Sequence, residues 1–217
     1  MINQWSKLPT TPPYILDIDK TTIEGKKAKF NENTELHFEL LPEPFLGNFL
    51  APVILLNLNP GYSPDDIIYH QQQTFIDLSL ANLNHQSLEY PFFLLDPSLS
   101  APGREWWERK LGALIRDTNK ETVANTVLCV EYFPYHSRRF GHHKLFLPSQ
   151  EYSFHLVRQA MARNAIIVLM RSKKLWLSAV PELEEYSSLF SVRNVQNPTI
   201  SPGNCPESYT SIIRALK

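Results

Sequence analysis

The sequence predicts an α/β protein, a three-layer α/β/α fold with a mostly parallel central sheet of about four strands. Four short apolar runs bounded by turn residues are typical of strands buried on both faces of a sheet. Segments with helical periodicity separate these runs, and strands that alternate with helices usually pair in parallel between two helical layers. The 217 residues suffice for one such unit and its hydrophobic core.

The expected elements follow from the pattern of apolar residues. Strands are predicted at residues 53–56, 126–130, 165–170 and 189–192. Helices are predicted at residues 77–82, 104–116, 149–162 and 173–180, and from residue 204 to the C-terminus. Ser149 is expected to cap its helix, and Asn204 with Glu207 forms an expected capping box at the start of the last helix.

The first fifty residues lack this alternation of strands and helices. Prolines are frequent near the N-terminus, and residues 34–41 alternate between polar and apolar side chains in the manner of a half-exposed strand. We therefore interpret residues 1–50 as an N-terminal extension that packs on a domain of residues 51–217.

Charge and cysteine content limit the class of protein. With 21 Lys and Arg against 22 Asp and Glu, the net charge is −1, so nucleic-acid binding would require a local basic patch. Two distant cysteines, Cys129 and Cys205, indicate neither a Cys₄ metal site nor a disulfide framework. The N-terminus lacks the apolar segment of a secretion signal, and no apolar run approaches the length of a membrane span. We expect a cytoplasmic monomer without a membrane partner.

The loop after the first predicted strand carries a distinctive polar group. In folds of this class ligands bind beyond the carboxyl ends of the strands, and here the sequence is Asn-Leu-Asn-Pro-Gly-Tyr-Ser at residues 57–63. Pro60 stiffens the turn, and Gly61 permits a positive φ or a close backbone approach, so the amide of Asn59 would have a fixed orientation. The alternative is an ordinary β-turn.

The loop after the last predicted strand is polar as well. Residues 197–204 read Asn-Pro-Thr-Ile-Ser-Pro-Gly-Asn and immediately precede the last predicted helix. A helix N-terminus can receive an anion such as a phosphate, because its first N–H groups are free. The alternative is an ordinary capped loop.

Taken together, the two loops resemble a known family. Leu58-Asn-Pro-Gly61 after the first core strand and Asn197-Pro-Thr-Ile-Ser201 after the last resemble the two signature motifs of the uracil-DNA glycosylase superfamily. The branches with an Asn-Pro-Gly first motif, mismatch-specific and single-strand-selective, are the most similar, and the correspondence extends over residues 50–217. The resemblance implies a protein that hydrolyses the N-glycosidic bond of a damaged or mismatched base in DNA.

The resemblance also implies roles for individual residues. Asn59 would position the attacking water at the sugar C1′, and the loop that begins at the second catalytic residue, Asn197, would contact the flipped nucleotide and stabilise developing charge. The base-binding residues would be Leu58, Pro60, Gly61, Tyr62, Glu131 and Tyr132. The candidate residues for contact with DNA phosphates are Ser63, Arg138, Arg139, Arg171, Lys173, Lys174, Pro198, Thr199 and Ser201. The five basic residues among them follow the second and third predicted strands and so fall on the ligand-binding edge; the alternative is that they are solvated charges of ordinary loops. The DNA would be single-stranded or have an extruded base, which Tyr62 would stack against unless it is a core aromatic.

Three residues depart from the family pattern. Asn57 stands where Gly is usual, Thr199 where Ser is usual, and Glu131 where many members have an Asn that reads a pyrimidine. An ionised Glu131 only accepts hydrogen bonds, so it would either face a base amino group or pair with a nearby arginine. Two alternative functions therefore remain: a non-catalytic member of the fold that binds nucleic acid or a nucleotide, and a nucleoside hydrolase.

No metal or cofactor is expected. The histidines that follow the second predicted strand, His136, His142 and His143, do not have the spacing of a recognised ligand set.

Overall fold

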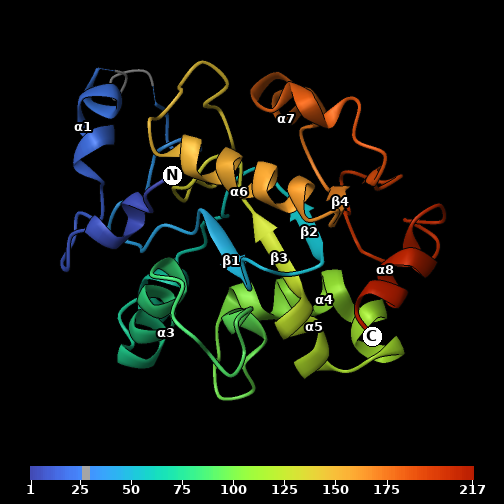
Figure 1. Ribbon diagram of the computed structural model, residues 1–217. Helices are drawn as coiled ribbons and strands as arrows, with labels where there is room; N and C mark the ends of the chain where they lie inside the picture. The colour runs from blue at the N-terminus through green and yellow to red at the C-terminus, as the bar shows by residue number, and fades with distance from the viewer. Residues whose placement is uncertain (26–29) are drawn as a thin grey trace.

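The computed structural model describes residues 1–25 and 30–217, and a five-stranded sheet lies at its centre (Figure 1). The strands are β1 (Phe45–Gly47), β2 (Val53–Leu56), β3 (Val127–Val130), β4 (Ile166–Leu169) and β5 (Leu189–Ser191), in the order β1-β3-β2-β4-β5. Strands β2 to β5 are parallel, and β1 pairs antiparallel with β3. The predicted α/β fold with a mostly parallel sheet is confirmed, with five strands instead of four.

The central strand β2 is apolar along its whole length because both of its faces are covered. Ile54 and Leu56 belong to the hydrophobic core on one face of the sheet, and Val53 and Leu55 belong to the core on the other. All four residues are fully buried. Because successive side chains of a strand point to opposite faces, a strand between two helical layers requires a continuous apolar run.

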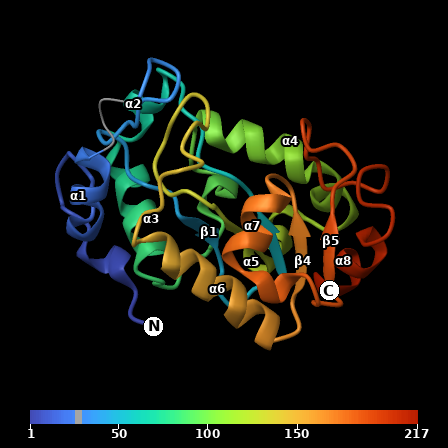
Figure 2. The ribbon, with the colours of Figure 1, turned by 90° about the horizontal axis from the view of Figure 1, so that it is seen from above.

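Helices pack on both faces of this sheet (Figures 1 and 2). The face of Ile54 is covered by α6 (Gln150–Ala162) and α7 (Lys173–Ala179), and the face of Val53 by α4 (Pro102–Asp117), α5 (Lys120–Thr126) and α8 (Tyr209–Ala215). α3 (Gln73–Leu83) lies at the β1 edge, where Asn82 donates to Phe45 O at 2.9 Å. The remaining helices are α1 (Asp17–Glu24) and α2 (Asp66–Tyr69), with 3₁₀ turns at Gln4–Lys7, Phe93–Leu95 and Pro181–Leu183. Among the described residues, none of these helices has the length and apolar character that crossing a membrane requires.

The prediction of a half-exposed strand at residues 34–41 is wrong. This segment consists of turns and irregular backbone. Leu36 and Leu40 are buried although the segment is not a strand of the sheet, so the alternation of the sequence reflects burial alone. The backbone N–H of His37 donates to the carbonyl of His136 at 3.0 Å, so the segment packs against the loop that follows β3.

The two predicted helix caps do not form. α8 begins well beyond Asn204, whose side chain instead closes the preceding loop: its oxygen accepts from Asn194 N at 2.7 Å, and its amide donates to Thr199 O at 2.8 Å. The Ser149 side chain makes no capping hydrogen bond, although its backbone N–H donates to the carboxylate of Asp19 at 3.1 Å.

The N-terminal residues contribute to the core on the α6 side of the sheet. Trp5, Leu16 and Ile23 are buried there. Asp19, which has no exposed surface, accepts a 2.8 Å hydrogen bond from the hydroxyl of Tyr135, in the loop after β3. This buried contact fixes α1 against the loops that surround the carboxyl end of the sheet.

Candidate functional site

A cavity of about 510 Å³ opens at the carboxyl ends of the parallel strands. Asn57 follows β2, Glu131 follows β3 and Arg171 comes shortly after β4, and all three line it. The chain leaves β2 toward the helices of the α4 face, but it leaves β3 and β4 toward α6 and α7. Such a reversal opens a crevice beyond the strand ends, and its volume is in the range of small-molecule sites.

Asn57 and Glu131 are joined by a hydrogen bond inside this cavity. The Asn57 amide Nδ2 donates to Glu131 Oε1 at 2.9 Å, and the residues are 5% and 6% exposed. The backbone N–H of Asn57 donates to Val130 O, and that of Glu131 to Pro44 O, so both side chains start from fixed backbone. The two other side-chain oxygens, Asn57 Oδ1 and Glu131 Oε2, are buried without a hydrogen-bond partner in the part of the chain that the structure describes.

The environment of Glu131 favours its protonated form. Burial raises the pKa of Glu131 to about 7, although the hydrogen bond from Asn57 and the positive charge of Arg171 act in the opposite direction. The side chains of residues 1–25 and 30–217 form no ion pair between Glu131 and an arginine, so its direct partner is an amide. The Arg171 Nε is itself buried without a partner among these residues.

Asn59 is held between the loops that follow β2 and β3. Its Nδ2 donates to Pro60 O at 2.8 Å and to Ser137 Oγ at 3.1 Å. These two contacts identify the amide nitrogen and leave the oxygen, Oδ1, as an acceptor for a water or a ligand. Asn59 lines the cavity, as predicted for this loop from its position at a strand end.

The neighbouring residues of the first motif line the cavity too, but in different environments. Gly61 has neither the positive φ nor the close backbone approach that were predicted as alternatives, since a Cβ added there would meet nothing within 4 Å. The ring of Tyr62 stacks on the imidazole of His37, with centroids 3.3 Å apart, and the Arg138 guanidinium lies 5.9 Å from its centroid. Tyr62 is therefore a half-buried member of the cavity wall with one ring face already covered.

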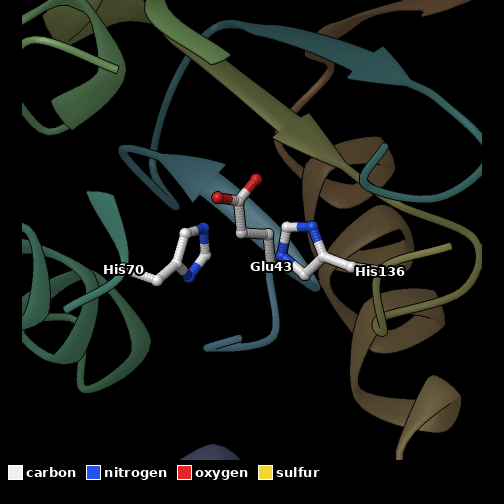
Figure 3. Close-up of side chains that lie close together, drawn as sticks. All are labelled: Glu43, His70 and His136. Carbon is white, nitrogen blue, oxygen red and sulfur yellow. The ribbon is translucent and has the colours of Figure 1, made fainter. Parts of the chain in front are cut away.

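A cluster of three titratable side chains, Glu43, His70 and His136, forms another part of the wall (Figure 3). Each offers a possible ligand atom within 4.8 Å of the others. The backbone of Leu41 orients both imidazoles: its N–H donates to His70 Nδ1 at 3.1 Å, and its carbonyl lies 2.9 Å from His136 Nε2. The other ring nitrogen of His136 lies 2.6 Å from Gly61 O.

These hydrogen bonds compete with metal binding. A metal ligand must present a nitrogen lone pair, but the Nδ1 lone pair of His70 already receives the Leu41 N–H, which leaves the proton on Nε2. Both nitrogens of His136 face carbonyl oxygens, so a metal would displace at least one of these contacts. The donor set therefore does not fit a preformed metal site.

The same cluster has unusual acid–base properties. Burial, with the nearby charges of Asp66 and Glu131, raises the pKa of Glu43 to about 8. Burial lowers the pKa of His136 to about 4, and it lowers that of His70 as well. Two carboxyl groups with raised pKa values, Glu43 and Glu131, thus line a single cavity, which is a common property of functional sites.

The predicted phosphate-binding residues divide into two groups. Arg138, Arg139 and Arg171 line the cavity, and the first two are exposed. Lys173 and Lys174 are exposed at the start of α7 and are not among the lining residues.

The loop of the second motif lies beside the cavity. Asn197 is exposed, and its Oδ1 accepts a 2.7 Å hydrogen bond from Lys110 Nζ. That ammonium group lies 5.1 Å from the ring centroid of Trp106, which does line the cavity. Asn197, Pro198, Thr199 and Ser201 are not among the lining residues themselves.

Of the remaining predicted base-binding residues, some line the cavity and one does not. Leu58 and Pro60 line the cavity, as does the phosphate candidate Ser63. Tyr132 packs on the α6 side instead, with its ring 5.6 Å from Phe154. The lining residues that sequence reasoning missed include Glu43, Asp66, His70, Trp106 and Trp107.

Comparisons with family models, curated proteins and solved structures find no match for this chain.

Proposed function

We propose that this protein has a uracil-DNA glycosylase-like three-layer fold and hydrolyses the N-glycosidic bond of a damaged or mismatched base in DNA. The observation that supports the proposal is the placement of Asn59, Glu131 and Arg138 around one cavity beyond the ends of neighbouring parallel strands. The proposal includes a cytoplasmic monomer that acts on single-stranded DNA or on DNA with an extruded base.

The chemistry suits the residues of the first motif. Dissociative cleavage of an N-glycosidic bond builds positive charge on the sugar and negative charge on the base, so oriented dipoles stabilise the transition state. The Asn59 Oδ1 is free of the contacts that hold its Nδ2, and it can accept a hydrogen bond from a water that attacks C1′. Asn59 would orient this water without acting as a strong base.

The walls of the cavity suit a nucleotide. Trp106 and Phe140 supply aromatic rings on which an extruded base can stack, and the exposed Arg138 and Arg139 lie where phosphates can reach them. These arginines concentrate positive charge at the cavity although the net charge of the chain is −1.

The test is the formation of abasic sites. Single- and double-stranded oligonucleotides that contain uracil, hypoxanthine, mismatched thymine, cytosine or adenine at one position are incubated with the protein, and alkali then cleaves the strand at any abasic site. We expect cleavage by the natural protein, at least about a hundredfold less by Asn59→Ala, and unchanged cleavage by Asn84→Ala, a control at the exposed end of α3.

The alternative functions correspond to different results of this experiment. Release of the base from a free nucleoside, with intact oligonucleotides, would assign a nucleoside hydrolase. Salt-sensitive DNA binding without any release of base would assign a non-catalytic binding protein.

A further inference from the structure

We infer that the base held in this cavity carries an exocyclic amino group, which Asn57 and Glu131 recognise through their two unpartnered oxygens. The inference rests on the proposed function and names the class of base. Both oxygens are buried without a hydrogen-bond partner in the described part of the chain, and both residues line the cavity. Buried polar atoms are normally satisfied, so this pair of acceptors indicates a donor that is supplied from outside the chain.

The contact between the two side chains fixes which atoms remain free when Glu131 is ionised. Asn57 Nδ2 donates to Glu131 Oε1 at 2.9 Å, and a flipped amide would instead place its oxygen against an oxygen of the carboxylate. Glu131 Oε1 also lies 3.7 Å from the Cys129 thiol, a second donor. Glu131 Oε1 is therefore the occupied carboxylate oxygen, which leaves Glu131 Oε2 and Asn57 Oδ1 as acceptors.

An amino group matches this pair of acceptors. It presents two N–H groups, so each oxygen can receive one of them. The oxo group of uracil or hypoxanthine at the equivalent ring position presents only lone pairs, which Asn57 Oδ1 and the Oε2 of an ionised Glu131 would repel.

Arg171 extends the same pattern. Its Nε is a buried donor with no partner among residues 1–25 and 30–217, and the residue lines the cavity from the end of the neighbouring strand β4. Next to their amino group, cytosine and adenine present an unprotonated ring nitrogen, which accepts a hydrogen bond. Uracil and hypoxanthine carry an N–H at that position. The two acceptors and one donor of the cavity therefore complement an amino-bearing base and oppose its oxo counterpart at both atoms.

The inference is tested by binding, without cleavage. Calorimetry measures the affinities of the natural protein for two matched pairs, deoxycytidine against deoxyuridine and deoxyadenosine against deoxyinosine. The measurements are made at pH 8.5, because burial raises the pKa of Glu131 to about 7 and the carboxylate must be ionised. We expect the amino member of at least one pair to bind about tenfold more tightly or better.

Glu131→Gln provides the matched variant. It keeps the size of the side chain but replaces one acceptor by an N–H donor, so the preference should fall below about threefold. Glu207→Gln, on an exposed residue, should retain the preference. If Glu131→Gln fails to fold, the ratio in the natural protein decides alone.

The possible results separate this inference from the proposed function. Equal affinities, preference for the oxo member in both pairs, or no binding of any nucleoside would overturn the inference. Preferred binding of an amino-bearing nucleoside, with every oligonucleotide left intact, would support the inference and reject glycosylase activity. Cleavage at uracil together with preferred binding of both deoxyuridine and deoxyinosine would support the activity and reject the inference.

Discussion

The side-chain amide of Asn57 donates a 2.9 Å hydrogen bond to the carboxylate of Glu131, and this contact joins the carboxyl ends of two paired strands. Leu56, the last residue of β2, pairs with Val130, the last residue of β3, so the residues that follow them must meet. A buried acid thus has a neutral donor as its direct partner. The stability of this carboxyl end of the sheet and the protonation of Glu131 are therefore coupled.

Replacement of Asn57 by Ala should destabilise the protein by about 1–3 kcal/mol, because the buried Glu131 loses its amide donor. The decrease in the free energy of unfolding should be larger at pH 8.5 than at pH 6, since only the ionised carboxylate of Glu131 needs that donor strongly. Urea unfolding at both pH values measures the free energy of unfolding. Asn84→Ala, at the exposed end of α3, is the control. Equal losses at the two pH values would show that the amide does not stabilise the charged form.

Stability should fall as the pH rises from 6.5 to 8.5. The pKa values of Glu131 and Glu43 are raised to about 7 and about 8, so between their unfolded and folded pKa values the folded state binds more protons than the unfolded state. The buried histidines act oppositely, because the pKa values of His136 and His142 are lowered to about 4, but their effect ends near the unfolded pKa of about 6.5. Above that pH the two carboxyl groups dominate the change, and we expect a loss of about 2–3 kcal/mol.

Thermal unfolding followed by calorimetry at several pH values measures whether the free energy of unfolding falls between pH 6.5 and 8.5. The double variant Glu43→Gln with Glu131→Gln should have a nearly flat profile between pH 6.5 and 8.5, because amides do not titrate in this range. A natural protein whose stability rises over the same range would contradict the raised pKa values.

If DNA binds at the cavity, two pairs of basic residues should differ in their effect. Arg138→Ala with Arg139→Ala removes charges at the cavity and should reduce the slope of log affinity against log salt by about 1–1.5 for single-stranded DNA. Lys173→Ala with Lys174→Ala removes the same charge from exposed positions on α7, outside the cavity lining, and should change the slope less. Fluorescence anisotropy with a labelled oligonucleotide measures both. A larger effect of the lysine pair would place the phosphates along α7.

The parts of the site that could be predicted are those attached to strand ends. The apolar run of residues 53–56 identifies a central strand, and the carboxyl ends of parallel strands share one edge of the sheet. This rule selected Asn59, Glu131 and Arg171, and all three line the cavity. No comparable rule applied to Glu43, because the strand that follows it, β1, was not predicted, and a charged residue between two prolines is the one signal that its sequence offers.

The other residues of the site could not be predicted, because their positions depend on contacts between loops, which the periodicity of the sequence does not encode. His70 and His136 reach the cavity wall because both bond to the backbone of Leu41, which is far from either in the sequence. Asn197 follows the last strand, but the side chain of Asn204 closes this loop through hydrogen bonds with the backbone of Asn194 and Thr199. Asn197 therefore lies beside the cavity and not in its lining. A strand end therefore predicts position well only where the following loop is short or leads directly into the crevice.

The edge strand β1, which no prediction anticipated, supplies the last test. It contains three residues and ends at Gly47, whose φ of 120° lies in a region that other residues rarely adopt. A Cβ added there would collide with the carbonyl oxygen of Val127, in the paired strand β3. Gly47→Ala should therefore destabilise the protein by about 2–3 kcal/mol, measured by urea unfolding.

Gly203→Ala is the matched control, because its Cβ would meet nothing within 4 Å and its φ is not positive, so the free energy of unfolding should change by less than about 0.5 kcal/mol. Glu43 lies just before β1, and Gly47 closes this strand against β3. The loss of Gly47 should consequently disturb the cavity wall as well, visible as a lower apparent pKa of Glu43 in a carboxyl-specific infrared titration, since a loosened wall admits water. Equal stability of the two alanine variants would contradict the placement of β1 against β3.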